Sequence, residues 1–139
     1  PKVDMKKGVK IFNALSNATK NGLIRSMHDC SEGGLAVSFA EMAFSGNLGL
    51  EIDLKEVPYR SKDRRDDHIL FSESNSRFVV EVDPKNQKKF EDILKDVSFA
   101  LVGKVVGDTR LSINGLNGKE CLGARIAELK EAWQKSLRW

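Results

Sequence analysis

Residues 35–44 place apolar side chains around nearly the whole circumference of a helix, and this feature constrains the chain most. Only Ser38 and Glu41, with Ser45 just beyond, form a polar stripe. A helix that is apolar on most sides is packed on most sides, so the sequence predicts a buried helix covered by other elements. Gly46 follows as the expected left-handed cap. The apolar members are Leu35, Ala36, Val37, Phe39, Ala40, Met42, Ala43 and Phe44.

Helix and strand patterns alternate on both sides of this helix. Asn21-Gly22 ends the first helix, and Asp83-Pro84 supplies a cap residue and a first-position proline for a later one. A late hairpin through Asn114-Gly115 breaks strictly parallel order. We therefore expect an α+β sandwich with a mixed four- to five-stranded sheet covered by helices. The expected strands are 23–28, 48–54, 76–82 and 99–106, with a hairpin over 108–118. The first expected helix spans 6–20, and the second begins at about 33. A third begins at 83–84 and buries Phe90, Ile93 and Leu94, and a fourth begins at about 124 and carries Ile126, Leu129, Trp133 and Leu137 on one stripe.

Length, charge and cysteine usage narrow the class of protein. The 139 residues suit one domain over 1–139 with a core of its own. The net charge is only +3, and the basic residues are spread among 20 acidic ones, which argues against nucleic-acid binding. Cys30 and Cys121 lie far apart without a CxxC partner, which argues against a zinc ribbon or a secreted disulfide scaffold. No segment has the apolar length of a membrane span or a signal peptide, so we expect a cytoplasmic protein. The opening residues 1–4 suggest a cut connector, and hence a fragment of a longer chain.

The segment HDCSEGG, residues 28–34, crowds polar side chains and two glycines at the start of the buried helix. Free backbone N–H groups and the helix dipole favour anions there, and glycines let a phosphate approach the backbone. Asp29 could hold Mg²⁺ through oxygen, and His28 could contact a phosphate or shuttle a proton. The alternative is a capped helix start, with Ser31 or Asp29 as the cap and His28 bonded at a turn.

A second polar segment, FSESNSRF at 71–78, precedes a Val-rich strand. Residues 73–75 could recognise a ribose or an amide, and Arg77 could reach a phosphate. The alternative is a turn whose Ser and Asn side chains bond their own backbone. Neither segment contains the nucleophile–base pair that acyl transfer needs. The charged stretch 57–67 reads as a solvated loop, or else a mobile lid, and His68 beside it as solvated.

Together the two segments carry a family resemblance. HDCSEGGLAVSFAEMA followed by LFSESNSRFVVEV resembles the C-terminal domain of the AIR-synthase-related superfamily. Within it, the pattern is most similar to the second, C-terminal copy of that domain in the large subunits of phosphoribosylformylglycinamidine (FGAM) synthases. The ending at 127–133 and the opening Pro1-x-Val3-Asp4 are similar as well, so the likeness covers nearly the whole chain.

This resemblance implies a reaction and partners. FGAM synthases use ATP, Mg²⁺ and glutamine-derived ammonia to convert formylglycinamide ribonucleotide into FGAM in purine biosynthesis, with ATP activating the amide oxygen. The implied partners are the N-terminal synthetase domains of the same chain, a glutaminase subunit and a small bridging subunit. The family's catalytic histidine and ATP-binding lysine belong to N-domains, so no catalytic residue is expected here and the fragment is expected to be inactive alone.

The site residues carry over with one departure. In the first copy, the aspartate matching Asp29 is linked to Mg²⁺, and a Glu-Ser-Gln matching residues 73–75 contacts substrate; here Asn75 replaces the glutamine. The second copy borders an auxiliary nucleotide site, so the resemblance implies half of a nucleotide or phosphate site, with Asp29 as the metal ligand. The expected members are His28, Asp29, Ser31, Gly33, Gly34, Glu73, Ser74, Asn75 and Arg77.

Three competing hypotheses remain. The chain could belong to a selenophosphate synthetase, a thiamine-monophosphate kinase, an AIR synthase or a hydrogenase-maturation factor, although their glycine motifs differ and they lack FSESxSRF. It could be a non-catalytic association module that dimerises through an exposed apolar sheet face. It could also be a metal hydrolase using His28, Asp29 and Glu32, although three ligands so close in sequence rarely converge on one ion.

Overall fold

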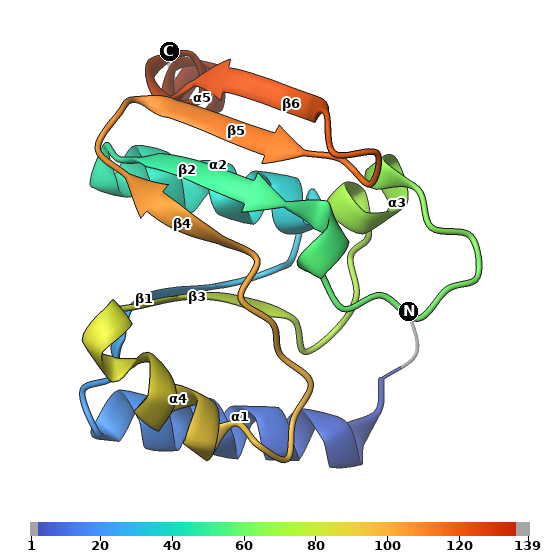
Figure 1. The fold of residues 1–139 in the computed structure, drawn as a ribbon, viewed down its shortest axis with the longest axis vertical. Coiled ribbons are helices and arrows are strands. Elements are labelled where there is room, and N and C mark those ends of the chain that lie inside the picture. Colours follow the sequence, from blue (N-terminus) through green and yellow to red (C-terminus); the bar gives the residue numbers. More distant parts are fainter. Residues whose placement is uncertain (1–2, 136–139) are drawn as a thin grey trace.

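The elements stack in four layers in the computed structural model, which describes residues 3–135 (Figure 1). Two helices form the first layer, two strands the second, two helices the third and four strands the fourth; α5 packs on α2 beside the last strand. The first layer contains α1 (Met5–Lys20) and α4 (Gln87–Ile93), and the second contains β1 (Ile24–Asp29) and β3 (Phe78–Val82). The third contains α2 (Gly34–Gly46) and α3 (Asp66–Phe71), and the fourth contains β4 (Gly103–Val106), β2 (Gly49–Asp53), β5 (Arg110–Asn114) and β6 (Glu120–Arg125). The remaining elements are α5 (Ile126–Lys135) and the 3-10 turns Leu54–Glu56 and Pro84–Asn86.

Helix α2 is the centre of the fold, as its apolar circumference predicts. It contacts both sheets as well as α3 and α5, and its residues Leu35, Phe39 and Ala43 are buried. The left-handed residue that ends it is Asn47, with φ of 51°, and its N–H donates to the Ala43 carbonyl. The prediction of Gly46 as that cap was wrong by one residue, because asparagine also tolerates this conformation.

The strands divide between two sheets. The order β4-β2-β5-β6 gives a mixed four-stranded sheet, with β2 and β5 parallel and the other pairs antiparallel, which confirms the expected mixed sheet. Strands β1 and β3 form a separate antiparallel pair, which the sequence did not indicate. The hairpin also extends further than expected: β6 continues to Arg125, where a helix from about 124 was predicted, because its residues pair with β5.

Several element boundaries differ from the predicted ones. Helix α3 (66–71) takes in the last two residues of the predicted loop 57–67, because Ile69 and Leu70 pack under α2. The strand predicted over 99–106 contains only 103–106, and the preceding residues are a connector. The expected burial of Phe90 is confirmed, and Ile126 is buried at the start of α5. Leu137, expected on the same stripe, lies outside the described residues.

Two hydrophobic clusters fill the spaces between layers, one around α2 and the four-stranded sheet, the other between α1, α4 and β3. The outward face of the four-stranded sheet is charged: Glu51 pairs with Lys104 at 2.8 Å, and Arg110 with Glu120 at 2.6 Å. Strand alternation sends most apolar residues of this sheet inward, although Val105 of β4 is 39% exposed. Dimerisation through an exposed apolar sheet face stays a prediction. No helix within residues 3–135 has the length and apolar character needed to cross a bilayer.

Candidate functional site: a pocket between α1 and the start of α2

The two polar segments that the sequence singled out lie side by side. Strand β1 ends at Asp29, which pairs in register with Phe78 at the start of β3. The Cys30 N–H extends this pairing by donating to the Arg77 carbonyl at 2.9 Å. Residues 28–34 and 71–78, about 40 positions apart in sequence, therefore meet because each adjoins one of two paired strands.

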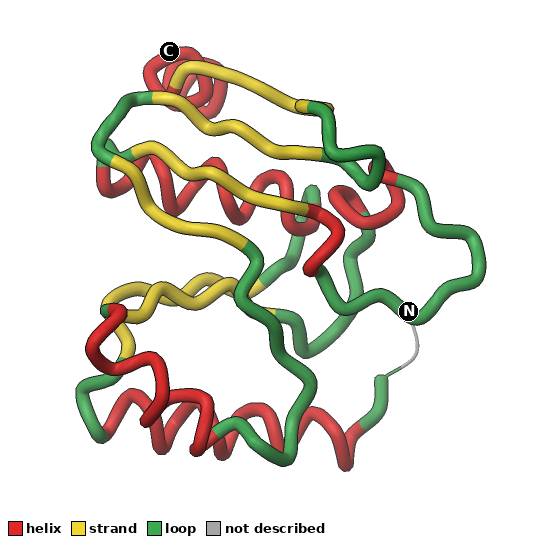
Figure 2. Tube along the Cα trace, viewed as in Figure 1, coloured by secondary structure: helices red, strands yellow, loops and turns green. Residues whose placement is uncertain are grey.

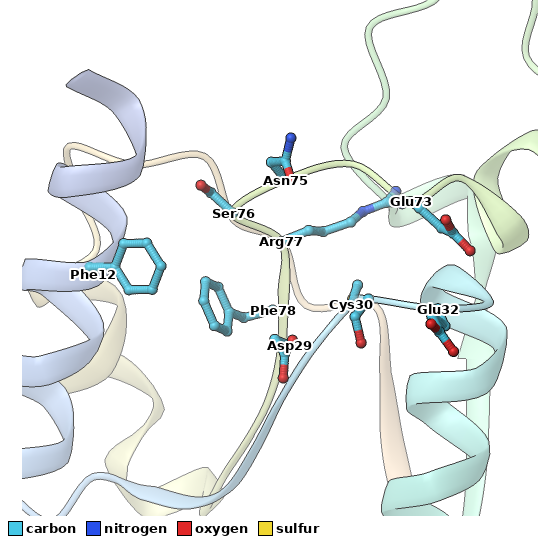
Figure 3. Close-up of a pocket in the computed structure, with 10 residues that line it drawn as sticks. Phe12, Asp29, Cys30, Glu32, Glu73, Asn75, Ser76, Arg77 and Phe78 are labelled. Carbon is cyan, nitrogen blue, oxygen red and sulfur yellow. The ribbon is translucent and has the colours of Figure 1, made fainter. Parts of the chain in front are cut away.

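A pocket of about 530 Å³ opens where these segments face α1 (Figure 3). Five of the nine predicted site residues line it, and so do Cys30, Ser76, two aromatic residues and Glu32, which the sequence suggested only as a hydrolase ligand. The predicted residues that line the pocket are Asp29, Ser31, Glu73, Asn75 and Arg77, and the aromatic ones are Phe12 and Phe78.

The first turn of α2 is capped by the chain's own carboxylate. The Gly33 N–H donates to Glu73 Oε1 at 2.9 Å, across 40 residues of sequence. No side chain caps this helix from within its own segment, so the alternative in which Ser31 or Asp29 caps it is wrong. A carboxylate is favoured at a helix N-terminus by the dipole. Since Glu73 already supplies negative charge there, a phosphate would reach this amide only by displacing Glu73.

The paired glycines are explained by backbone geometry. Both have positive φ, 75° at Gly33 and 62° at Gly34. A Cβ at Gly34 would lie 2.7 Å from the Leu70 carbonyl oxygen and 2.9 Å from that of Ser72. Gly34 therefore lets the start of α2 pack directly on the end of α3, whereas a Cβ at Gly33 would meet Val37 of α2 itself. Neither glycine lines the pocket.

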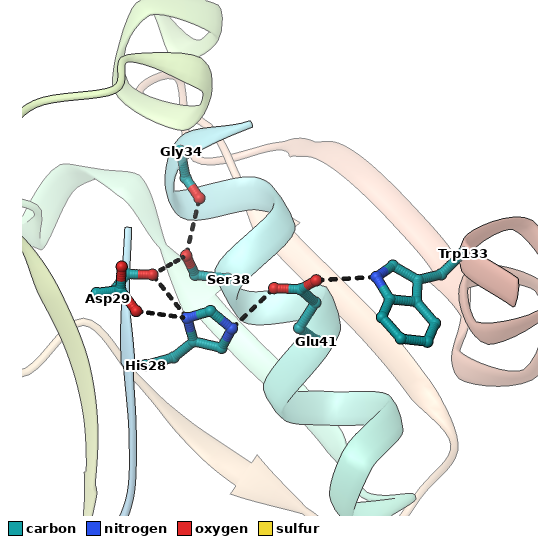
Figure 4. Close-up of polar contacts among 6 residues, drawn as sticks. All are labelled: His28, Asp29, Gly34, Ser38, Glu41 and Trp133. Atoms are coloured by element: carbon teal, nitrogen blue, oxygen red, sulfur yellow. Dashed lines mark hydrogen bonds and ion pairs between the residues drawn. The ribbon is translucent and has the colours of Figure 1, made fainter. Parts of the chain in front are cut away.

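His28 turns away from the pocket, toward α2 (Figure 4). Its Nε2 lies 2.8 Å from Glu41 Oε2, and Trp133 Nε1 donates to Glu41 Oε1 at 3.0 Å. Its Nδ1 lies 2.6 Å from the Asp29 carbonyl oxygen and 3.8 Å from that residue's carboxylate. The Glu41 carboxylate thus links β1 to α5. Successive side chains of a strand point to opposite faces. This alternation was the sequence signal that could have predicted that His28 and Asp29 point in opposite directions.

Arg77 lines the pocket, but its guanidinium is held by the end of α3. Nη1 donates to Ser72 Oγ at 3.1 Å and to the Ser72 carbonyl oxygen at 3.3 Å. Arg77 forms no ion pair with a carboxylate in residues 3–135. Burial lowers the pKa of the Arg77 guanidinium from its ordinary value, since a charged group loses hydration inside the fold.

The pocket joins an aromatic wall to an acidic one. Phe12 and Phe78 meet edge to face, with ring centroids 5.4 Å apart. Three carboxylates, those of Asp29, Glu32 and Glu73, and one guanidinium, that of Arg77, line the same opening. This charge balance disfavours a bare anion; it suits hydroxyl groups, or a phosphate that arrives with a cation.

The carboxylates at the pocket are the groups that could bind Mg²⁺. No group of three His, Cys, Asp or Glu side chains converges to hold a metal in residues 3–135, so the hydrolase hypothesis built on His28, Asp29 and Glu32 finds no support. Mg²⁺ is commonly bound through one or two carboxylates together with the phosphates of its nucleotide. The Asp29 carboxylate lines the pocket and is 67% exposed, so it could be one such ligand to an Mg²⁺ ion that is also bound by nucleotide phosphates.

Comparisons with known proteins agree with this architecture. Residues 1–115 match the family model described as AIR synthase related protein, C-terminal domain. Phosphoribosylformylglycinamidine synthase subunit PurL of Methanocaldococcus jannaschii is 38% identical over 136 residues, which cover 98% of this chain and 18% of that protein. The chain therefore spans about a fifth of the length of this curated relative.

Solved structures give the same fold. Thermotoga maritima PurL complexed with FGAR superposes with a TM-score of 0.82, covering 91% of this chain and 21% of that one; its complex with ATP gives 0.78, with 86% and 21% covered. At 24% identity these likenesses show the fold alone. Because the family model matches 115 of the 139 residues, this chain belongs to the family of the C-terminal domain of AIR synthase related proteins.

Proposed function

We propose that the chain is the C-terminal domain of the large subunit of an FGAM synthase. In this role it belongs to an ATP-dependent ligase that uses Mg²⁺ and glutamine-derived ammonia to convert formylglycinamide ribonucleotide into FGAM, in the cytoplasm. The observation that carries the proposal is the 38% identity to a PurL subunit over 98% of the chain, including both polar segments that form the pocket. The proposed partners are the N-terminal synthetase domains of the same chain, a glutaminase subunit and a small bridging subunit.

We propose that the pocket supplies half of a nucleotide site. The rings of Phe12 and Phe78, which meet edge to face, offer an apolar wall for a base, while Ser31 and Asn75 offer hydrogen bonds to a ribose or an amide. Asp29 would hold Mg²⁺, which when bound neutralises phosphate charge. The other predicted residues have indirect roles in this proposal. Glu73 fixes the start of α2 and Arg77 orders residues 72–77. Gly34 allows α2 to approach α3, Gly33 leaves room for Val37 at the helix start, and His28 anchors β1.

Calorimetric titration tests the half-site. Because the pocket holds three carboxylates, ATP should bind only together with Mg²⁺, and Asp29→Asn should weaken that binding about tenfold or more. Asp92→Asn, which removes an exposed carboxylate of α4 away from the pocket, is the matched control and should leave binding unchanged. Equal affinity with and without Mg²⁺, or an Asp29→Asn variant that binds like the parent, would contradict the proposed site.

Reconstitution tests the reaction separately. The chain alone should turn over neither ATP nor formylglycinamide ribonucleotide. Co-expression with the N-terminal synthetase domains of a PurL subunit should restore FGAM formation, measured with ammonia as the nitrogen source. Nucleotide hydrolysis by the chain alone would favour a free-standing hydrolase. We also propose that residues 1–139 form one domain, which predicts a single calorimetric unfolding transition.

A further inference from the structure

A second cavity lies on the other side of residues 74–78. It has a volume of about 520 Å³ and runs along β3, enclosed by α1, α4, residues 57–61 and the connector 97–103. We refer to it as the β3 groove. Figure 2 shows the connector as a long loop that crosses from α4 to β4 in front of β3. The β3 groove shares only residues 75–78 with the pocket described above, and it lies outside the function proposed for that pocket.

The floor of the β3 groove is apolar because the two hydrophobic clusters meet there without closing. Leu35 and Phe39 reach it from the cluster around α2. Leu15, Phe90 and Leu94 reach it from the cluster around α1. Strand β3 pairs only with β1 among the described strands, so its other edge has no neighbouring strand to fill the space. The volume falls in the range of small-molecule sites, roughly 300–1,000 Å³.

The charges around the β3 groove are all of one sign. Among the described residues, the charged ones that line it are Lys7, Arg60 and Arg77, and none of the aspartates and glutamates of residues 3–135 does so. None of these three cations forms an ion pair within residues 3–135. The neighbouring pocket, by contrast, carries three carboxylates. Arg77 is a half-buried guanidinium whose hydrogen bonds go to the neutral oxygens of Ser72 and Ile69. An anion at Lys7 and Arg60 would therefore meet two cations that pair with no carboxylate among the described residues.

We propose that the β3 groove binds a small amphipathic anion. An aromatic or branched aliphatic body would lie against Ile11, Val80 and Phe99, which line the groove and are partly exposed, and one carboxylate or phosphate group would lie at Lys7 and Arg60 on the rim. The apolar floor contributes affinity through burial, and the cations select the anionic group through charge-assisted hydrogen bonds. This combination excludes inorganic phosphate, which has no apolar body, and cationic amphiphiles, which meet like charge.

NMR titration of the chain with a matched series of probes tests the proposal. The series is 4-phenylbutyrate, its uncharged amide, the amine 4-phenylbutylamine, phenyl phosphate and inorganic phosphate. We expect 4-phenylbutyrate and phenyl phosphate to shift the amide signals of Val79, Val80 and residues 98–102 in a saturable way. The amide should bind about tenfold more weakly, and the amine and inorganic phosphate should leave these signals unchanged. The ratio of the two anions then distinguishes a carboxylate ligand from a phosphate ligand.

Charge-reversal variants complete the test. Lys7→Glu with Arg60→Glu should weaken 4-phenylbutyrate binding more than tenfold. Lys6→Glu with Arg64→Glu makes the same change in net charge at neighbouring residues outside the groove and should alter binding less than twofold. Circular dichroism establishes that both pairs fold. Equal binding of the acid and its amide, equal effects of the two variant pairs, or shifts confined to the Asp29 pocket would each overturn the proposal.

Discussion

Replacement of Gly34 by alanine distinguishes two explanations for the paired glycines: close packing of the fold, and access of a phosphate to the backbone. If the pair serves close packing, the added methyl group destabilises the fold even when no ligand is present. Gly34 has φ of 62°, and its Cβ would lie 2.7 Å from the Leu70 carbonyl oxygen. Two other glycines serve as controls. Gly22 has φ of 65° with nothing within 4 Å of a Cβ, and Gly46 has neither a positive φ nor a close neighbour.

The expected magnitudes follow from these geometries. A non-glycine residue in the left-handed region costs about 1–2 kcal/mol, and overpacking against rigid backbone costs about 1–3 kcal/mol. Gly34→Ala should therefore lower the free energy of unfolding by about 2–5 kcal/mol, whereas Gly22→Ala, whose Cβ would meet no neighbour, should lose only about 1–2 kcal/mol. Gly46→Ala should be neutral or gain about 0.5 kcal/mol, because alanine restricts the unfolded chain.

Urea denaturation and thermal melts of the three variants measure these differences. For a chain of this length, 1 kcal/mol corresponds to about 3–4 °C in Tm, so Gly34→Ala should melt about 6–20 °C below the parent. Close packing at Gly34 is refuted if Gly34→Ala loses no more stability than Gly22→Ala. That result would mean that the end of α3 moves aside freely and that close packing does not explain the second glycine.

Three further predictions concern groups outside the pocket. Glu41→Ala should lower the free energy of unfolding in urea by about 1–2 kcal/mol, since Glu41 links His28 to Trp133; an unchanged urea midpoint would show that this link adds nothing. The side-chain hydrogen bond from Arg25 holds the pKa of Asp83 below its ordinary value. The ionised Asp83 therefore stabilises the folded state above its unfolded pKa of about 3.9, and this contribution is lost as the pH falls through the folded pKa. Arg25→Gln should therefore lose less stability than the parent between pH 7 and about pH 2.5, and equal losses would contradict the assignment. Burial raises the pKa of both thiols, but Cys30 is only 7% exposed whereas Cys121 is exposed. Iodoacetamide at pH 8 should therefore modify Cys121 before Cys30, as followed by mass spectrometry. Equal rates would contradict the burial of Cys30.

Local sequence patterns determined those parts of the fold that depend on one segment at a time. The apolar circumference of residues 35–44 predicts a central helix, because hydrophobicity on every side has to be buried wherever the helix lies. The alternating residues 48–54 likewise predict a half-buried strand with Leu50 and Ile52 inward, as observed. Both polar segments could also be singled out, because their polar residues contrast with the apolar runs that follow them.

Tertiary structure decided which groups meet. The Gly33–Glu73 hydrogen bond joins residues 40 apart, and the Glu41–Trp133 bond joins residues 92 apart. No local pattern contains the distance or direction between such segments, because these follow from how β1 pairs with β3 and how α5 packs on α2. The same holds for Phe12, which enters the pocket from a helix that the sequence connects to neither motif. A residue's type and period are fixed along the chain, whereas its partners are fixed only when distant surfaces pack together.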